Sequence, residues 1–255
     1  MRPVTVQLPQ GKLDAAWWGG PARSALVLLH EGLGSVGLLR DFPARLHQTT
    51  RQPVFAYSRF GYGRSDPAKL PRPLDYLTRE AALLPAILAE AGIDDAVLIG
   101  HSDGATIAAA VAQVRGLVLI APHFVTEPAG LAAIAATRTS FASGDLRARL
   151  ARHHRDPDAT FHGWADAWLD PGFPAALDLR PALARITAPT MVIQGRNDPY
   201  GSDLHARLAA ALIPGGARIV LLDAQHAPHL EAPDATLAAI ADFVRPLLPE
   251  TQDAD

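Results

Sequence analysis

The stretch AVLIGHSDGATIAAAV, residues 96–111, joins a short apolar run to an apolar helical pattern through Gly100, Ser102 and Gly104. A Gly-x-Ser-x-Gly sequence between a strand and a helix predicts a sharp, strained turn, because glycines let the two elements approach where a Cβ would clash. Such a turn would place the Ser102 hydroxyl above the carboxyl edge of a sheet. The alternative is that Ser102 only caps the following helix, although a cap needs no glycine before it.

Five more apolar runs predict further strands, at residues 24–30, 52–58, 116–122, 189–195 and 217–223. Each is a short apolar run, and most are rich in Val, Leu and Ile, as is typical of strands buried on both faces of a parallel sheet. Segments with helical spacing lie between several of them, and two clear examples are residues 75–92 and 232–249. The alternation predicts an α/β fold with a mostly parallel sheet and helices on both faces. Residues 4–19 alternate around a Pro-Gln-Gly turn and predict an antiparallel hairpin at the sheet edge.

One long interval interrupts this alternation. Between Pro122 and Pro189 no strand-like run occurs, and an ordinary connection in a compact domain is far shorter. We therefore expect a helical cap at residues 126–185, inserted into a core formed by residues 1–125 and 186–255. Its aromatic side chains are expected either to wall a substrate pocket or to pack the cap on the core, and they include Phe161, Trp164, Trp168 and Phe173.

Composition limits the classes of function. The chain has 255 residues and a formal charge of −3, from 23 basic and 26 acidic residues, so nucleic acid and anionic membrane are not expected partners. It has no cysteine, which excludes disulfides, thiolate metal sites and a cysteine nucleophile. No apolar run approaches the roughly 20 residues that span a bilayer. We expect a cytoplasmic protein with a small-molecule substrate, and a homodimer remains open.

A serine hydroxyl becomes a strong nucleophile only when a base takes its proton and a third group holds that base. In parallel sheets the partners should follow later strands, because sites assemble at the carboxyl ends of strands. Asp198 follows the run at 189–195, and His226 follows the run at 217–223. Glu127 is the alternative acid and His229 the alternative base, while His101 is expected to have a structural role beside the turn.

Together these segments resemble the α/β-hydrolase superfamily, and within it the capped serine hydrolases of small esters, the carboxylesterase-like branch. The likeness spans nearly the whole chain, and its motifs are LLHEGLGS (28–35), YSRFGYGRSDP (57–67), GHSDGA (100–105), GRNDPYG (195–201) and HAPHLEAP (226–233). The order Ser102, Asp198, His226 is the order that this superfamily uses for its catalytic triad. The motifs are specific for the fold and for the catalytic residues, but they give little information about the substrate.

The resemblance also implies an oxyanion hole formed by the backbone N–H groups of Gly32 and Asp103. The sequence differs from the family pattern at two positions beside this hole. Glu31 stands where the family usually has glycine, and Asp103 stands where it usually has an apolar residue. Two carboxylates beside a hole that must hold an anion would oppose the chemistry unless they are paired. We expect Glu31 to form a salt bridge with Arg59 or Arg64, although it could instead face the substrate pocket.

The function implied is hydrolysis of small carboxylic esters through an acyl-enzyme, without a cofactor. No zinc-type spacing of three ligands is present, so no metal is expected. A serine at the turn argues against dehalogenases and epoxide hydrolases, which use a carboxylate nucleophile on this fold. A lactonase, a carbon-carbon bond hydrolase, a thioesterase or an aminopeptidase could use the same residues. A catalytically idle module that binds a small molecule is the alternative outside enzymes.

Overall fold

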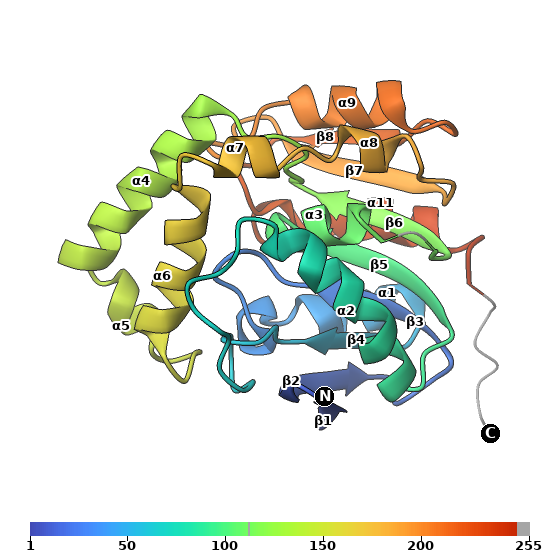
Figure 1. Ribbon diagram of the computed structural model, residues 1–255. Helices are drawn as coiled ribbons and strands as arrows, with labels where there is room; N and C mark the ends of the chain where they lie inside the picture. Colours follow the sequence, from blue (N-terminus) through green and yellow to red (C-terminus); the bar gives the residue numbers. More distant parts are fainter. Residues whose placement is uncertain (112, 249–255) are drawn as a thin grey trace.

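The structure is a computed structural model that describes residues 1–111 and 113–248. Residues 249–255 lie outside the described residues. They include the end of the predicted core and the last position of the helix predicted at 232–249. One sheet runs through the described part of the chain (Figure 1), in the order β1-β2-β4-β3-β5-β6-β7-β8. Its strands are β1 (Arg2–Leu8), β2 (Gly11–Trp18), β3 (Ser24–Leu29), β4 (Val54–Tyr57), β5 (Asp95–His101), β6 (Gly116–Ile120), β7 (Thr190–Gly195) and β8 (Arg218–Leu222).

The strand pattern confirms the expected α/β fold. β1 pairs with β2 and β2 with β4 in antiparallel register, whereas the pairs from β4 to β8 are parallel. The predicted hairpin is therefore present at the sheet edge. β3 to β7 are almost wholly buried, as their continuous apolar runs predict.

Helices cover both faces of the sheet, because side chains alternate along each strand. On one face, Leu26 and Leu28 share a core with α1 (Phe42–Thr50) and α11 (Pro233–Val244). On the other face, Val27 and Leu29 belong to a second core, to which α2 (Tyr76–Glu90), α3 (Asp103–Ala109) and α9 (Leu204–Leu212) contribute. Two short helices complete the core, the 3-10 helix η1 (Val36–Leu39) and α10 (Pro228–Glu231).

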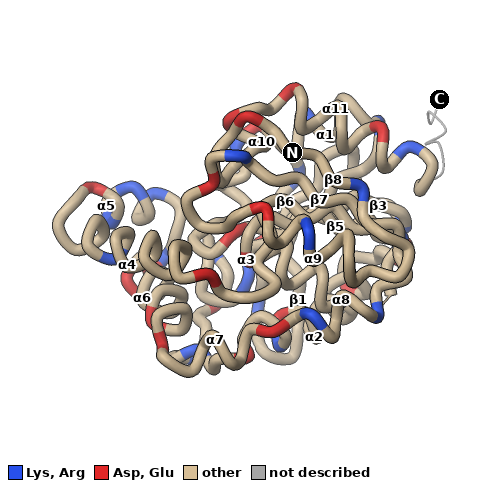
Figure 2. Tube along the Cα trace, turned by 90° about the horizontal axis from the view of Figure 1, so that it is seen from above, with Lys and Arg blue, Asp and Glu red and all other residues tan. Residues whose placement is uncertain are grey.

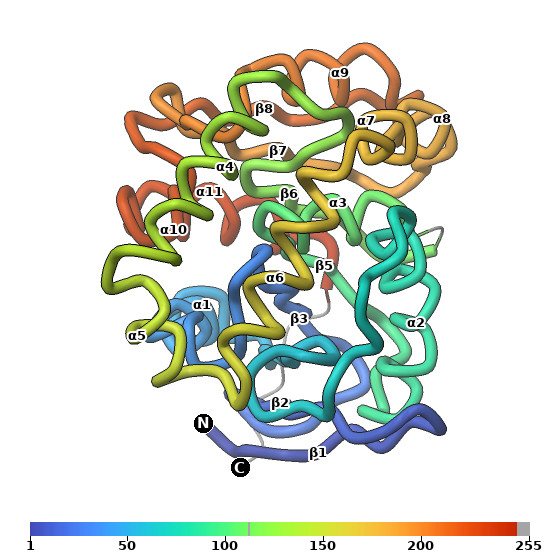
Figure 3. Tube along the Cα trace, turned by 60° about the vertical axis from the view of Figure 1, so that its left-hand side comes forward, coloured from blue at the N-terminus to red at the C-terminus, as the bar shows by residue number. Residues whose placement is uncertain are grey.

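The helical segment between β6 and β7 consists of α4 (Pro128–Ser143), α5 (Leu146–Leu150), α6 (Pro157–Trp168), α7 (Phe173–Ala176) and α8 (Arg180–Leu183). Figure 1 shows α4, α5 and α6 grouped at one end of the sheet, and in Figure 3 α6 passes in front of the strands. Ion pairs join α6 to its neighbours, from Arg138 to Asp166 and from Arg147 to Asp158. We use the term cap for residues 126–185. β6 and β7 are neighbours in the sheet, so the cap leaves and re-enters the core at adjacent strands.

Charged residues of both signs are interspersed along the trace in Figure 2, including around α4, α5 and α6. None of the helices in the described residues combines the length and apolar character needed to cross a bilayer.

Candidate active site

Ser102 lies at the strained turn between β5 and α3, with φ 53° and ψ −117°. The neighbouring glycines are required by close packing. A Cβ at Gly100 would lie 2.2 Å from the carbonyl oxygen of Gly104, and one at Gly104 would lie 2.1 Å from that of Leu29. Ser102 occupies the N-cap position of α3, but its hydroxyl makes no capping hydrogen bond. The hydroxyl is therefore free for another partner.

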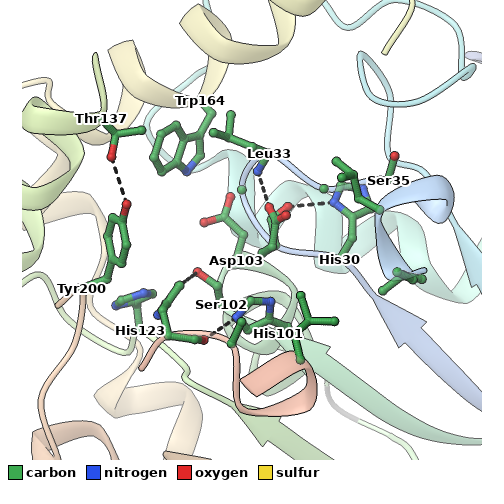
Figure 4. Close-up of a pocket in the computed structure, with 18 of the residues that line it drawn as sticks. His30, Leu33, Ser35, His101, Ser102, Asp103, His123, Thr137, Trp164 and Tyr200 are labelled. Carbon is green, nitrogen blue, oxygen red and sulfur yellow. Dashed lines mark hydrogen bonds between the residues drawn. The ribbon is translucent and has the colours of Figure 1, made fainter. Parts of the chain in front are cut away.

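That partner is His226. Its Nε2 lies 3.0 Å from the Ser102 Oγ, and its Nδ1 lies 3.0 and 2.9 Å from the two carboxylate oxygens of Asp198. The structure thus brings Ser102 to a histidine that lies 124 positions later in the chain (Figure 4 draws the hydrogen bond from Ser102). Asp198 lies 28 positions before that histidine. The Asp198 side chain is 1% exposed and that of His226 is 19% exposed, so the carboxylate is buried and the imidazole is partly accessible.

Asp198 is held by donors that the sequence did not reveal. Its Oδ1 accepts the N–H of Tyr200 at 2.8 Å and of Gly201 at 3.3 Å, and its Oδ2 accepts from the Gln194 side chain at 2.8 Å. Burial by itself would raise the pKa of Asp198, but the hydrogen bonds from His226 and these donors outweigh it and lower the pKa. The carboxylate is therefore ionised at neutral pH and can orient the imidazole.

The alternative acid and base have other partners. Glu127 accepts the N–H and the hydroxyl of Ser202 at 2.8 and 2.6 Å and lies 3.0 Å from the His205 Nε2. His229 is buried on α10, with its ring centroid 4.7 Å from that of His101, and burial lowers its pKa to about 4. Neither side chain hydrogen-bonds Ser102 or His226.

The backbone N–H groups of Gly32 and Asp103 have no hydrogen-bond acceptor among the described residues, as an oxyanion hole requires. A Cβ at Gly32 would lie 2.2 Å from the Trp164 Nε1, so a residue with a side chain would displace the cap at this point. The buried Trp164 N–H also lacks an acceptor among the described residues.

The side chain of Asp103 is buried and fully paired. Its carboxylate accepts from the Tyr76 hydroxyl at 2.6 Å and from the Trp168 Nε1 at 3.2 Å, and the Arg59 Nη2 lies 3.7 Å away. Trp168 also donates to the Tyr76 hydroxyl at 2.9 Å. The Asp103 side chain therefore connects α2 and α6 to the turn that carries Ser102.

The prediction that Glu31 forms a salt bridge with Arg59 or Arg64 is wrong. The Arg59 Nη2 donates to the backbone carbonyl of Glu31 at 2.9 Å, and within the described residues no Lys, Arg or His lies within 4.0 Å of the carboxylate. The carboxylate instead accepts the N–H of Leu33. Burial is the main cause that raises the pKa of Glu31, and the nearby charge of Arg59 opposes it. The Arg59 guanidinium is paired with the carboxylate of Asp103, and it contacts Glu31 through the backbone carbonyl instead of the carboxylate.

A cavity of about 260 Å³ opens beside Ser102 and is mostly apolar. Glu31, Trp164 and Trp168 line it. Residues that the sequence did not indicate also line it, among them Leu38, Ile134 and Leu230, together with His123, Thr137 and Tyr200, which Figure 4 labels. Phe161 does not line it, which corrects that prediction. The Phe161 ring stacks on Phe141 of α4 with centroids 3.9 Å apart, so it packs the cap internally. In residues 1–111 and 113–248, no three His, Asp or Glu side chains are grouped so that they could hold a metal ion.

Comparison with known proteins identifies the family of this chain. Residues 26–239 match the profile of the Alpha/beta hydrolase family. The chain is 32% identical over 269 residues to the polyketide synthase ThaQ of Burkholderia thailandensis, a match that covers 94% of this chain and 12% of the synthase. It is 27% identical over 252 residues to a pimeloyl-[acyl-carrier protein] methyl ester esterase of Stenotrophomonas maltophilia, covering 88% of this chain and 94% of that protein.

Among solved structures, a hydrolase from Pseudomonas aeruginosa matches with a TM-score of 0.72 and 26% identity, over 95% of this chain and 98% of that one. The family profile spans most of the sequence, including the turn at Ser102 and the segments that carry Asp198 and His226. The chain belongs to the alpha/beta hydrolase family.

Proposed function

We propose that this protein is a serine hydrolase that cleaves carboxylic esters of small substrates through an acyl-enzyme. The observation that carries the proposal is the hydrogen-bonded relay from Ser102 through His226 to Asp198 at the floor of the cavity. A hydroxyl, an imidazole and a carboxylate in this arrangement have the geometry of nucleophile, base and orienting acid.

In the acylation step, the Ser102 Oγ attacks the ester carbonyl carbon while the His226 Nε2 accepts the hydroxyl proton. The carbonyl oxygen becomes an oxyanion, and the N–H groups of Gly32 and Asp103 donate to it. Each such donor lowers the barrier by about 3 to 4 kcal/mol. The protonated His226 then donates its proton to the leaving alkoxide, and the alcohol departs.

In the deacylation step, the His226 Nε2 takes a proton from a water molecule that attacks the acyl-enzyme carbonyl. The second tetrahedral intermediate collapses, His226 returns the proton to the Ser102 Oγ, and the carboxylic acid leaves. Asp198 keeps the Nδ1 proton in place through both steps. The Tyr200 ring lies 4.7 Å from the imidazole, centroid to centroid, and covers it within the cavity.

The comparison with the methyl ester esterase supports an ester substrate over other acyl compounds, since that relative matches along nearly its full length. The fold alone does not distinguish esters from lactones, thioesters or carbon-carbon bonds, because one scaffold supports many reactions. The cavity volume of about 260 Å³ favours a small acyl group over a long chain.

The test is a substrate panel. We expect turnover of p-nitrophenyl acetate and butyrate, and a loss of kcat of about 10⁶-fold in Ser102→Ala, as for removal of a triad nucleophile. Ser35→Ala is the matched control, since Ser35 lines the same cavity outside the relay. A fluorophosphonate probe should label the wild type and the control but not Ser102→Ala.

Each alternative gives a different result. Turnover of lactones, thioesters or vinylogous diketones without turnover of simple esters would replace the ester proposal with the corresponding reaction. Absence of both labelling and turnover would support the idle binding module. Labelling without dependence on Ser102 would mean that the relay is not the nucleophilic centre.

A further inference from the structure

Three carboxyl groups lie in or beside the cavity, and they differ in how they are paired. Asp198 accepts from His226 and three further donors, and Asp103 accepts from Tyr76 and Trp168 beside Arg59. Glu31 accepts only the N–H of Leu33. Its second carboxylate oxygen has no hydrogen-bond or ion-pair partner within the described residues, and the residue lines the cavity.

The backbone of Glu31 is fixed, so its side chain projects from a defined point. Its carbonyl oxygen accepts from the His30 Nδ1 at 2.7 Å, from the Arg59 Nη2 at 2.9 Å and from the N–H of Gly34 at 3.1 Å. The cation that could have neutralised the carboxylate is thus occupied by the backbone of the same residue and by Asp103.

Glu31 also precedes Gly32, whose N–H we assign to the oxyanion hole. Both residues line the cavity, so a substrate carbonyl bound at that N–H would have its neighbouring atoms in the same cavity as the Glu31 side chain. Of the described residues that line the cavity, none is Lys or Arg. Burial lowers the pKa values of His101, His123 and His229, so these rings are neutral at pH 7 and offer no positive charge to an anionic substrate.

We propose that Glu31 sets substrate choice: the site takes esters that carry a hydrogen-bond donor, an ammonium or a hydroxyl, next to the reacting carbonyl, and rejects esters with a carboxylate there. This inference rests on the proposed ester hydrolysis. A donor would pair with the free oxygen of Glu31, whereas a second carboxylate would meet a like charge in a partly desolvated cavity.

The test compares kcat/KM for four methyl esters at pH 7, with acid release as the readout. They are methyl pentanoate, methyl 3-hydroxybutanoate, methyl 3-aminobutanoate and monomethyl succinate. We expect the wild type to prefer the amino and hydroxy esters to methyl pentanoate. It should disfavour monomethyl succinate by about tenfold or more, because the two carboxylates repel each other.

Glu31→Gln keeps an acceptor for Leu33 and removes the charge, so it should bring the monomethyl succinate to methyl pentanoate ratio close to one and reduce the preference for the amino ester. Glu127→Gln is the matched control, because Glu127 hydrogen-bonds Ser202 and does not line the cavity. It should keep the wild-type ratios.

The outcomes separate the two proposals. If the neutral ester is hydrolysed but the succinate ratio is equal in wild type and Glu31→Gln, the inference on Glu31 is overturned and ester hydrolysis stands. A wild type that hydrolyses monomethyl succinate as fast as methyl pentanoate overturns it without any variant. If none of the esters is hydrolysed by the wild type, ester hydrolysis itself fails.

Discussion

The His101 Nε2 lies 2.7 Å from the backbone carbonyl oxygen of His226, so the residue before Ser102 holds the loop that carries His226. The two imidazole centroids are 5.0 Å apart. Burial is the main cause that lowers the pKa of His101, and the ring is therefore a neutral donor of one N–H at pH 7. The distance between Ser102 and His226 consequently depends on a bond made by a side chain outside the relay.

Replacing His101 should lower the turnover rate more than substrate affinity. We expect His101→Phe to reduce kcat about tenfold with little change in KM, since loss of one hydrogen bond of about 1 kcal/mol shifts the base. His101→Gln, whose amide can still donate, should recover part of that loss. Equal kcat in His101→Phe and wild type would show that the His226 loop is held by other contacts.

Asp103 should matter for stability as well as for catalysis. Asp103→Asn leaves the buried Arg59 without its counter-ion, and breaking a buried pair costs about 3 to 5 kcal/mol of unfolding free energy. Tyr76→Phe removes one donor to the carboxylate and should cost about 2 kcal/mol. Urea denaturation of both variants measures these costs.

The matched control is Asp94→Asn, since Asp94 forms an ion pair with Arg23 at the surface and its side chain is 57% exposed. Exposed pairs contribute roughly 0 to 1 kcal/mol, so this variant should unfold almost as the wild type does. A similar loss in Asp103→Asn and Asp94→Asn would contradict the role given to the buried cluster.

Gly32→Ala should damage the oxyanion hole through the cap. The added Cβ would lie 2.2 Å from the Trp164 Nε1, so either the indole or the loop must move. A displaced N–H at Gly32 should lower kcat by about 10- to 100-fold. Trp164→Leu removes the overlapping ring, and the double variant should regain part of the rate. The kcat values of the wild type, the two single variants and the double variant form a double-mutant cycle. If the effects of the two substitutions on the activation free energy are strictly additive, the contact is contradicted.

His154 should make stability depend on pH. Its Nδ1 accepts the N–H of Gly63 at 2.9 Å and its Nε2 donates to the Leu33 carbonyl at 2.8 Å, which joins the cap to two core loops. Burial lowers the pKa of His154 to about 4. In the unfolded chain a histidine titrates at about 6.5, so unfolding takes up a proton between these two values.

The free energy of unfolding should therefore fall as the pH drops from about 6.5 to 4, with His154 contributing up to about 1.4 kcal/mol per pH unit. His154→Gln should lower the free energy of unfolding at pH 7. It should also reduce the slope of that free energy against pH by the amount that corresponds to uptake of one proton. Thermal or urea unfolding at several pH values gives the slope. An unchanged slope in the variant would exclude His154 as a source.

The strands, the turn at Ser102 and the edge hairpin were predictable because each depends on a local pattern of apolar residues and glycines. The helices predicted at residues 75–92 and 232–249 are present as α2 and α11, although α11 ends at Val244, five residues before the predicted end. The candidate relay could be chosen from sequence because its members follow strand ends.

Predictions that depended on competition between partners were less successful. Arg59 was a reasonable partner for Glu31, but the sequence does not reveal that Asp103 would be closer to its guanidinium. Phe161 and Trp164 are three positions apart on α6, and only the packing against α4 decides which faces the cavity. The donors Gln194 and Tyr200 were missed because their bonds to Asp198 arise from the geometry of one turn.

The position of the cap between two adjacent strands has a consequence for how this enzyme class diversifies. Because β6 and β7 are already paired, the chain between them can lengthen, shorten or be exchanged without changing the register of any strand. The entropic cost of a longer connection grows only slowly with its length. Lining residues on α4, such as Ile134 and Thr137, can therefore be exchanged to reshape the cavity. Trp164 and Trp168 are more constrained, because one lies against Gly32 and the other donates to Asp103.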